Sequence, residues 1–216
     1  MPIYNAPLAD MKFILNDVFN ADQFWQSNEN LAHVDSATAE AILEEMAKFA
    51  QNVTLPLNRT GDEEGATFSN GAVTTPAGFK EAFKQYAEGG WIGLAADEEW
   101  GGQGMPKMLT VLADEMLFAT NPSFMLYPLL SVGAGMALNS YASQEQKETY
   151  LPKIYSGEWS GTMCLTEPHA GTDLGIIKTK AERNEDGTYN ITGTKIFITG
   201  GDHDLAENII HLVLVK

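Results

Sequence analysis

The sequence predicts an α+β protein in which a helical bundle precedes a β unit. Residues before about 157 show the three- and four-residue apolar spacing of amphipathic helices. Residues after 158 alternate short β-branched and aromatic segments with turns. We therefore divide the chain into an N-terminal extension (1–34), a helical domain (35–157) and a β domain (158–216).

The first helices of the bundle are marked by caps and by apolar stripes. Asp35 or Ser36 can cap a helix whose apolar residues recur through residues 39–53. The pair Thr75-Pro76 suits a first helical turn, because proline lacks only an N–H that has no partner there. The sequence therefore predicts one helix from about 36 and another from about 76.

The second half of the bundle contains the most apolar segment of the chain. A helix marked by residues 109–117 ends at Asn121-Pro122, and a capping box at 143–146 starts a helix through about 155. Between them, residues 122–138 have hydrophobic side chains on every side, which predicts the buried central helix of the bundle. Proline and glycine interrupt this segment, so we expect no integral membrane segment.

The β domain is predicted from four extended segments. They cover residues 159–166, 176–181, 189–199 and 209–215. The last is apolar on both faces, which is typical of a fully buried strand. A bare final strand exposes a sheet edge, and such an edge favours self-association, so a homo-oligomer is expected.

Charge and cysteine content exclude several classes of protein. The formal net charge is −16, whereas binding to nucleic acid needs a basic face, so no nucleic-acid partner is expected. Cys164 is the only cysteine and no secretory leader is visible, which fits a cytoplasmic protein. The four histidines show no persuasive metal-ligand spacing, so we predict no metal.

Two segments carry candidate site chemistry. Residues 170–173 (AGTD) allow a close backbone approach, which suits a phosphate or the polar edge of a cofactor, whereas an ordinary loop in which Asp173 caps its neighbours is the alternative that these residues alone favour. Residues 195–201 (KIFITGG) place an aromatic ring and a hydroxyl at a strand end, where a core aromatic and a terminal threonine are the alternative. Residue types alone leave both alternatives open.

Several motifs together resemble the acyl-CoA dehydrogenase family over nearly the whole chain. MCLTEP at 163–168 with the following AGTD, IKTKA at 177–181 and ITGTKIFITG at 191–200 are similar to the signature of the family's middle domain. QKETYLP at 146–152 and the segment 93–104 resemble its helical domain. The start, 7–15, is similar to the N-terminal extension of the longer-chain branch.

The resemblance implies a flavoenzyme with a helical domain, a partial β-barrel-like middle domain and a C-terminal helical domain that is absent here. It implies FAD as cofactor and acyl-CoA as substrate in α,β-desaturation of the fatty-acid β-oxidation type. An electron-transfer flavoprotein or a similar acceptor would be the partner. The residues expected to bind the cofactor are Met163, Leu165, Thr166, Gly171, Thr172, Phe197, Ile198 and Thr199, with Thr172 also near the substrate.

The resemblance also implies that the catalytic base is missing from this chain. In the family a glutamate of the C-terminal helical domain removes the α proton, so no catalytic residue is assigned here. Glu167 precedes Pro168 and is interpreted as a structural partner for a buried donor or cation. We expect the 216 residues to be inactive alone; the alternative is a non-catalytic fragment that acts as a packing or oligomerisation module.

Overall fold

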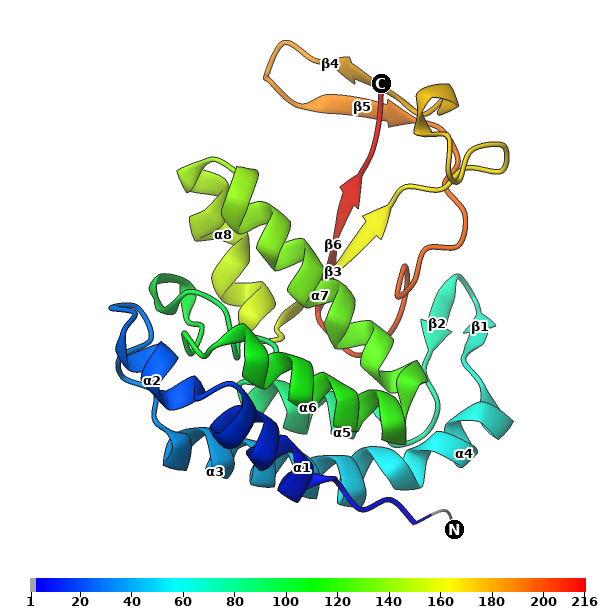
Figure 1. Cartoon of the computed structure of the whole chain (residues 1–216). Helices are drawn as coiled ribbons and strands as arrows, with labels where there is room; N and C mark the ends of the chain where they lie inside the picture. The colour runs from blue at the N-terminus through cyan, green and yellow to red at the C-terminus, as the bar shows by residue number, and fades with distance from the viewer. Residues whose placement is uncertain (1–2) are drawn as a thin grey trace.

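The computed structural model describes residues 3–216 as a layered helical body from which a β unit projects (Figure 1). The helices are α1 (Leu8–Phe13), α2 (Ala21–Gln26), α3 (Ser36–Phe49), α4 (Leu55–Glu64), α5 (Phe79–Glu88), α6 (Lys107–Thr120), α7 (Pro122–Tyr141) and α8 (Gln144–Tyr155). The strands are β1 (Thr67–Ser69), β2 (Ala72–Thr74), β3 (Trp159–Cys164), β4 (Lys180–Arg183), β5 (Tyr189–Thr192) and β6 (Asn208–Val213). The predicted α+β class is confirmed. Over residues 3–216 no helix has the length and apolar character to cross a membrane.

Helices α3 and α4 form one long element because a π-helical turn, Ala50–Thr54, joins them. The predicted cap at its start is confirmed, since the Asp35 side chain accepts a hydrogen bond from Thr38 N at 2.7 Å. Pro56 follows the π-helical turn. Proline cannot donate the usual helical hydrogen bond, and a wider turn is one way in which a helix accommodates it.

The predicted start of the next helix at Thr75-Pro76 is wrong, because α5 begins at Phe79. Thr75 donates both its N–H (3.0 Å) and its hydroxyl (2.7 Å) to the Asp204 carboxylate, which holds this segment outside the helix. Gly78 then adopts a left-handed conformation (φ 86°) that glycine tolerates best. A long-range contact therefore outweighs the local preference of proline.

The hydrophobic core lies between α3, α5, α6 and α7. Phe49, Phe79 and Tyr86 surround Phe124, and the Phe79 and Phe124 rings meet edge to face at 5.8 Å. The hydroxyls of Thr54 and Thr120, both fully buried, hydrogen-bond to each other at 2.7 Å.

Helix α7 begins at Pro122 as predicted but continues beyond residue 138 to Tyr141, and it is not buried on every side. One face packs on β3, where Gly161 lies so close that an added methyl would overlap the Ala134 methyl. The opposite face is open: Leu126 is 40% exposed, Met136 is 55% exposed, and a methyl added at Gly133 would meet no neighbour within 4 Å. An apolar helix therefore runs along the boundary between the two units with one uncovered apolar stripe.

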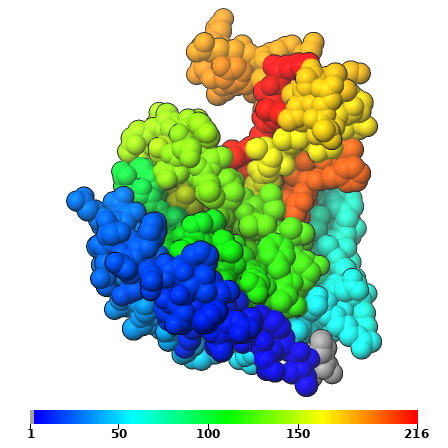
Figure 2. Space-filling view, in the orientation of Figure 1, coloured from blue at the N-terminus to red at the C-terminus, as the bar shows by residue number. Residues whose placement is uncertain are grey.

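The part of the chain that the structure describes contains three two-stranded sheets, two of them in the β unit, and no barrel closes. β3 and β6 pair in parallel, β4 and β5 form an antiparallel hairpin, and β1 and β2 form another hairpin at the Asn70-Gly71 turn. Figure 2 shows the β4–β5 hairpin, in orange, standing away from the helical body.

Three predicted strands are corrected by the structure. The segment 176–181 contains the end of a 3₁₀ turn (Leu174–Ile176), and β4 begins only at Lys180. The segment 189–199 is a strand only to Thr192, because the hydrogen bonds after Gly193 go to residues 165–167 and not to a neighbouring strand. β6 is a strand, but none of its residues is fully buried, since no second layer within residues 3–216 covers it.

Candidate functional site

The exit of β3 presents the first group of predicted site residues. Along the strand Thr162 and Cys164 are buried, whereas Met163 is 46% exposed on the opposite face. Leu165 and Thr166 follow the strand and are half-buried. The alternation of the strand therefore directs Met163 to the face opposite that of Thr162 and Cys164.

Glu167 organises the loop that follows. Its carboxylate is buried and accepts hydrogen bonds from Lys178 N (2.7 Å), Thr179 N (3.0 Å), the Thr179 hydroxyl (2.6 Å) and Lys195 Nζ (2.9 Å). Burial alone would raise the pKa of Glu167, but these hydrogen bonds outweigh burial and hold the pKa well below its ordinary value. The interpretation of Glu167 as a structural partner for a buried donor or cation is thus confirmed.

The segment 195–199 is attached to the β3 exit by two hydrogen bonds to backbone carbonyls. Ile196 N donates to Thr166 O at 2.9 Å, and Lys195 Nζ reaches Leu165 O at 3.0 Å. Phe197 then adopts a left-handed backbone (φ 58°), and the residue is 88% exposed. A bulky residue is costly in this region, and such outliers gather at ligand sites.

The remaining predicted residues lie on the same loops. Ile198 is half-buried, and Thr199, Gly171 and Thr172 are exposed. A methyl added at Gly171 would lie 3.8 Å from the Thr166 side chain, so the AGTD turn borders the β3 exit. Within residues 3–216 no hydrogen bond engages the hydroxyls of Thr166, Thr172 or Thr199. The surface therefore combines exposed apolar side chains with free hydroxyls.

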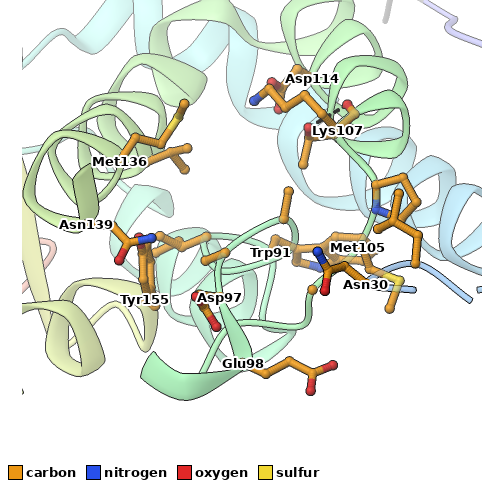
Figure 3. A pocket seen from close by; sticks show the side chains of 18 of the residues that line it. Asn30, Trp91, Asp97, Glu98, Met105, Lys107, Asp114, Met136, Asn139 and Tyr155 are labelled. Carbon is orange, nitrogen blue, oxygen red and sulfur yellow. Dashed lines mark hydrogen bonds between the residues drawn. The ribbon is translucent and has the colours of Figure 1, made fainter. Parts of the chain in front are cut away.

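A separate cavity of about 820 Å³ lies in the helical body and was not predicted from the sequence. Figure 3 shows Lys107 and Asp114 on one side and Met136 and Tyr155 on the other. Burial raises the pKa of Asp114, with Lys107 opposing it, and burial together with nearby Asp97 raises the pKa of Tyr155 to about 12. Lys107 and Asp114 are seven residues apart on α6, which is two helical turns, and this spacing could have indicated from the sequence that they share one face of the helix. None of the predicted cofactor residues lines this cavity.

Fold and site together define an α+β protein in which a helical body and an incomplete β unit meet at α7 and β3. The loop that leaves β3 and the segment 195–199 are joined by hydrogen bonds and together form a partly exposed surface. Two family models match this order: the acyl-CoA dehydrogenase N-terminal domain at residues 36–158 and the acyl-CoA dehydrogenase middle domain at 162–215. The chain therefore belongs to the acyl-CoA dehydrogenase family.

Named relatives agree with this membership. The chain is 43% identical to 3-methylmercaptopropionyl-CoA dehydrogenase of Ruegeria pomeroyi, over 99% of this chain and 36% of that protein. It is 37% identical to a butyryl-CoA dehydrogenase of Syntrophomonas wolfei, over 99% of this chain and 35% of that protein. An acyl-CoA dehydrogenase from Bacillus anthracis, solved in complex with FAD, superposes with a TM-score of 0.70 at 26% identity, over 86% of this chain and 29% of that one. The chain thus spans about a third of the length of its curated relatives.

Proposed function

We propose that this chain forms one wall of the flavin site and one wall of the acyl site of an FAD-dependent acyl-CoA dehydrogenase. The reaction is the desaturation of an acyl-CoA thioester between its α and β carbons, as in fatty-acid β-oxidation. The observation that carries the proposal is the surface at the β3 exit, where a strained, exposed Phe197 lies on a loop bonded to Thr166.

The residues of this surface fit a flavin ring. Met163, Leu165, Phe197 and Ile198 offer an apolar wall that would exclude water from the ring, and Thr166 and Thr199 offer hydroxyl donors at its rim. FAD, when bound, supplies the acceptor for the hydride that leaves the β carbon. Donors fixed by the protein would stabilise the negative charge of the reduced ring.

Gly171 and Thr172 would serve the polar end of the site. Both residues are exposed, and glycine permits a close approach by the FAD pyrophosphate or by the CoA end of the substrate, where Thr172 would make a contact.

The open stripe of α7 would form the acyl wall. Leu126, Gly133 and Met136 present apolar surface with no cover in residues 3–216, as an aliphatic chain requires. The named relatives act on butyryl and 3-methylmercaptopropionyl groups, and both groups are unbranched. We therefore expect unbranched acyl-CoA substrates, and a panel of branched and unbranched thioesters would test this.

The catalytic base would come from outside this chain. Glu167 is unsuited to the role because its carboxylate is buried and fully engaged by backbone, Thr179 and Lys195. With one wall of the flavin site and no base, the 216 residues alone should bind FAD weakly and show no turnover. The wider proposal divides the chain at 34/35 and 157/158 and includes a cytoplasmic homo-oligomer that passes electrons to an electron-transfer flavoprotein or a similar acceptor.

The test uses the whole protein that contains this chain. Thr166→Val and Thr199→Val each remove one hydroxyl, and the loss of about 0.5–1.5 kcal/mol per hydrogen bond predicts FAD binding weakened roughly two- to tenfold. Binding is followed by quenching of flavin fluorescence. Thr149→Val, an exposed threonine on α8, is the matched control and should bind FAD normally. Unchanged affinity in both site variants would contradict the placement of FAD.

If the isolated chain is instead yellow, with stoichiometric FAD and turnover with octanoyl- or palmitoyl-CoA, the assignment of the base is wrong. A whole protein that neither binds FAD nor turns over would favour the packing-module alternative.

A further inference from the structure

The loop of residues 200–206, here called the clamp loop, fastens the β unit to the helical body. His203 Nε2 lies 2.9 Å from the buried Ser160 hydroxyl of β3, and its ring meets Tyr127 of α7 edge to face at 5.3 Å. Asp204 accepts two hydrogen bonds from Thr75. Leu205 is 8% exposed and belongs to the main hydrophobic core. This short loop thus contacts β3, α7 and the segment before α5.

The hydrogen bonds of His203 fix its protonation state. Nδ1 accepts a hydrogen bond from Leu205 N at 3.1 Å, so it carries no proton. Nε2 must then carry the proton and donate to the Ser160 hydroxyl. A second proton on the ring would set two N–H groups against each other and break the bond to Leu205. Only the neutral ring fits this arrangement.

The surroundings of His203 contain both carboxylates and a second imidazole. Asp202 and Asp204 flank it on the loop, His211 approaches from β6, and Lys80 of α5 acts on Asp204. β3 contributes Ser160 and α7 contributes Tyr127, an ordinarily neutral phenol. Burial lowers the pKa of His203, and Asp202 and Asp204 oppose this shift without cancelling it.

The clamp loop is continuous with the proposed flavin wall. Gly201 N donates to Ile198 O at 3.1 Å and closes a tight turn, and a methyl added at Gly200 would lie 3.5 Å from the Tyr127 ring. At the other end of the wall, Ile196 N is bonded to Thr166 O. Residues 197–199 are therefore held at both ends, once by the β3 exit and once by the clamp loop.

We propose that His203 is a positioning residue whose neutral Nε2–H form holds the clamp loop, and with it residues 197–199, against α7 and β3. Protonation of Nδ1 releases the loop and loosens the wall. That residues 197–199 contact a flavin rests on the proposed function. The release of the clamp loop on protonation of His203 does not depend on it.

The experiment is amide hydrogen exchange of the 216-residue chain between pH 5 and pH 8, corrected for intrinsic rates. As the pH falls below about 6.5, the ordinary pKa of histidine, opening of peptides from 198–206 should increase about tenfold per unit until the folded pKa is reached. His203→Gln keeps a donor near Ser160 but cannot titrate, so its opening should be independent of pH. His33→Gln, a surface histidine of the helical body, should keep the wild-type dependence. A dependence that persists in His203→Gln, or is absent from the wild type, would overturn the proposal.

A second measurement covers the case in which His203→Gln fails to fold. In the wild-type chain, NMR titration should give one midpoint for the His203 ring and for the amides of Thr199 and Leu205, below the ordinary value for histidine. A ring midpoint near the ordinary value with no matching change at those amides would refute the mechanism. Neither measurement contains FAD, so FAD binding at neutral pH, measured separately on the whole protein, reports on the proposed function alone.

Discussion

Replacing Gly161 with alanine tests the contact on which the whole arrangement depends, the packing of β3 against α7. A methyl at this position would overlap the Ala134 methyl and lie 3.4 Å from Ser131 Cα and 3.6 Å from Leu130 O. The two backbone atoms are at ordinary van der Waals distances, whereas the Ala134 methyl is fixed by the backbone of α7 and cannot rotate away. Strand and helix must therefore separate.

The expected cost follows from this geometry. Overpacking of a well-packed contact costs about 1–3 kcal/mol. The separation also weakens the hydrogen bond that Gly161 N donates to Ser131 Oγ at 3.1 Å, worth about 1 kcal/mol. Ala134→Gly alone should cost about 1–2 kcal/mol, from the helix propensity of glycine and the loss of one buried methyl. In the double variant the overlap disappears, so the two changes should offset each other by about 1–3 kcal/mol.

The assay is a double-mutant cycle in which urea unfolding of four proteins gives four free energies of unfolding. Gly133→Ala is the control, because it lies on the open side of the same helix, and it should be neutral or stabilising by up to about 1 kcal/mol. Additivity within about 0.5 kcal/mol between the two substitutions would refute the close packing of β3 on α7.

Three further outcomes are expected. Phe197→Asn should raise the free energy of unfolding, measured in urea, by about 1 kcal/mol, because asparagine tolerates the left-handed backbone and the lost ring is exposed. The same variant should weaken FAD binding by the whole protein. A less stable variant would argue against backbone strain at Phe197. Burial would raise the pKa of Asp204, but hydrogen bonds from Thr75 hold this pKa below its ordinary value. The ionised carboxylate therefore stabilises the fold above about pH 4, and this stabilisation is lost as the pH falls further. The difference in unfolding free energy between wild type and Asp204→Asn should shrink on acidification to about pH 3, and a constant difference would count against this. Ser143→Ala removes one half of a capping box and should lower the free energy of unfolding by about 1 kcal/mol, whereas an unchanged urea midpoint would mean that the start of α8 is already frayed.

The sequence predicted those parts of the fold that depend on neighbouring residues. Asp35 and Ser143 cap helices as expected, because a cap acts within three residues of itself. The start of α5 could not be predicted, because Thr75 is held by Asp204, which lies 129 residues away. The exposure of β6 likewise depends on which layers surround the strand, and an apolar run in the sequence does not indicate which layers are present.

In the candidate site, too, local features could be predicted from the sequence and long-range contacts could not. Glu167 was recognised as a structural carboxylate from its place before Pro168, but its partner Lys195 is 28 residues away and no local pattern links the two. His203 and Ser160, which are 43 residues apart, could not be paired from the sequence either. The resemblance nominated residues 197–199, whereas only the structure showed that Phe197 is strained and that its loop is anchored at both ends.

The strained backbone of Phe197 persists because the segment that carries it is held at both ends. A bulky residue with a left-handed backbone relaxes unless its neighbours hold it, and an exposed ring gives it no packing of its own. Lys195, bound to the buried Glu167 carboxylate, holds the segment on one side, and His203, bound to Ser160, holds it on the other. Two polar groups fixed on the scaffold therefore hold one aromatic ring out toward solvent. That arrangement adds nothing to the core, and a ring held in this way is suited to meeting a flat ligand.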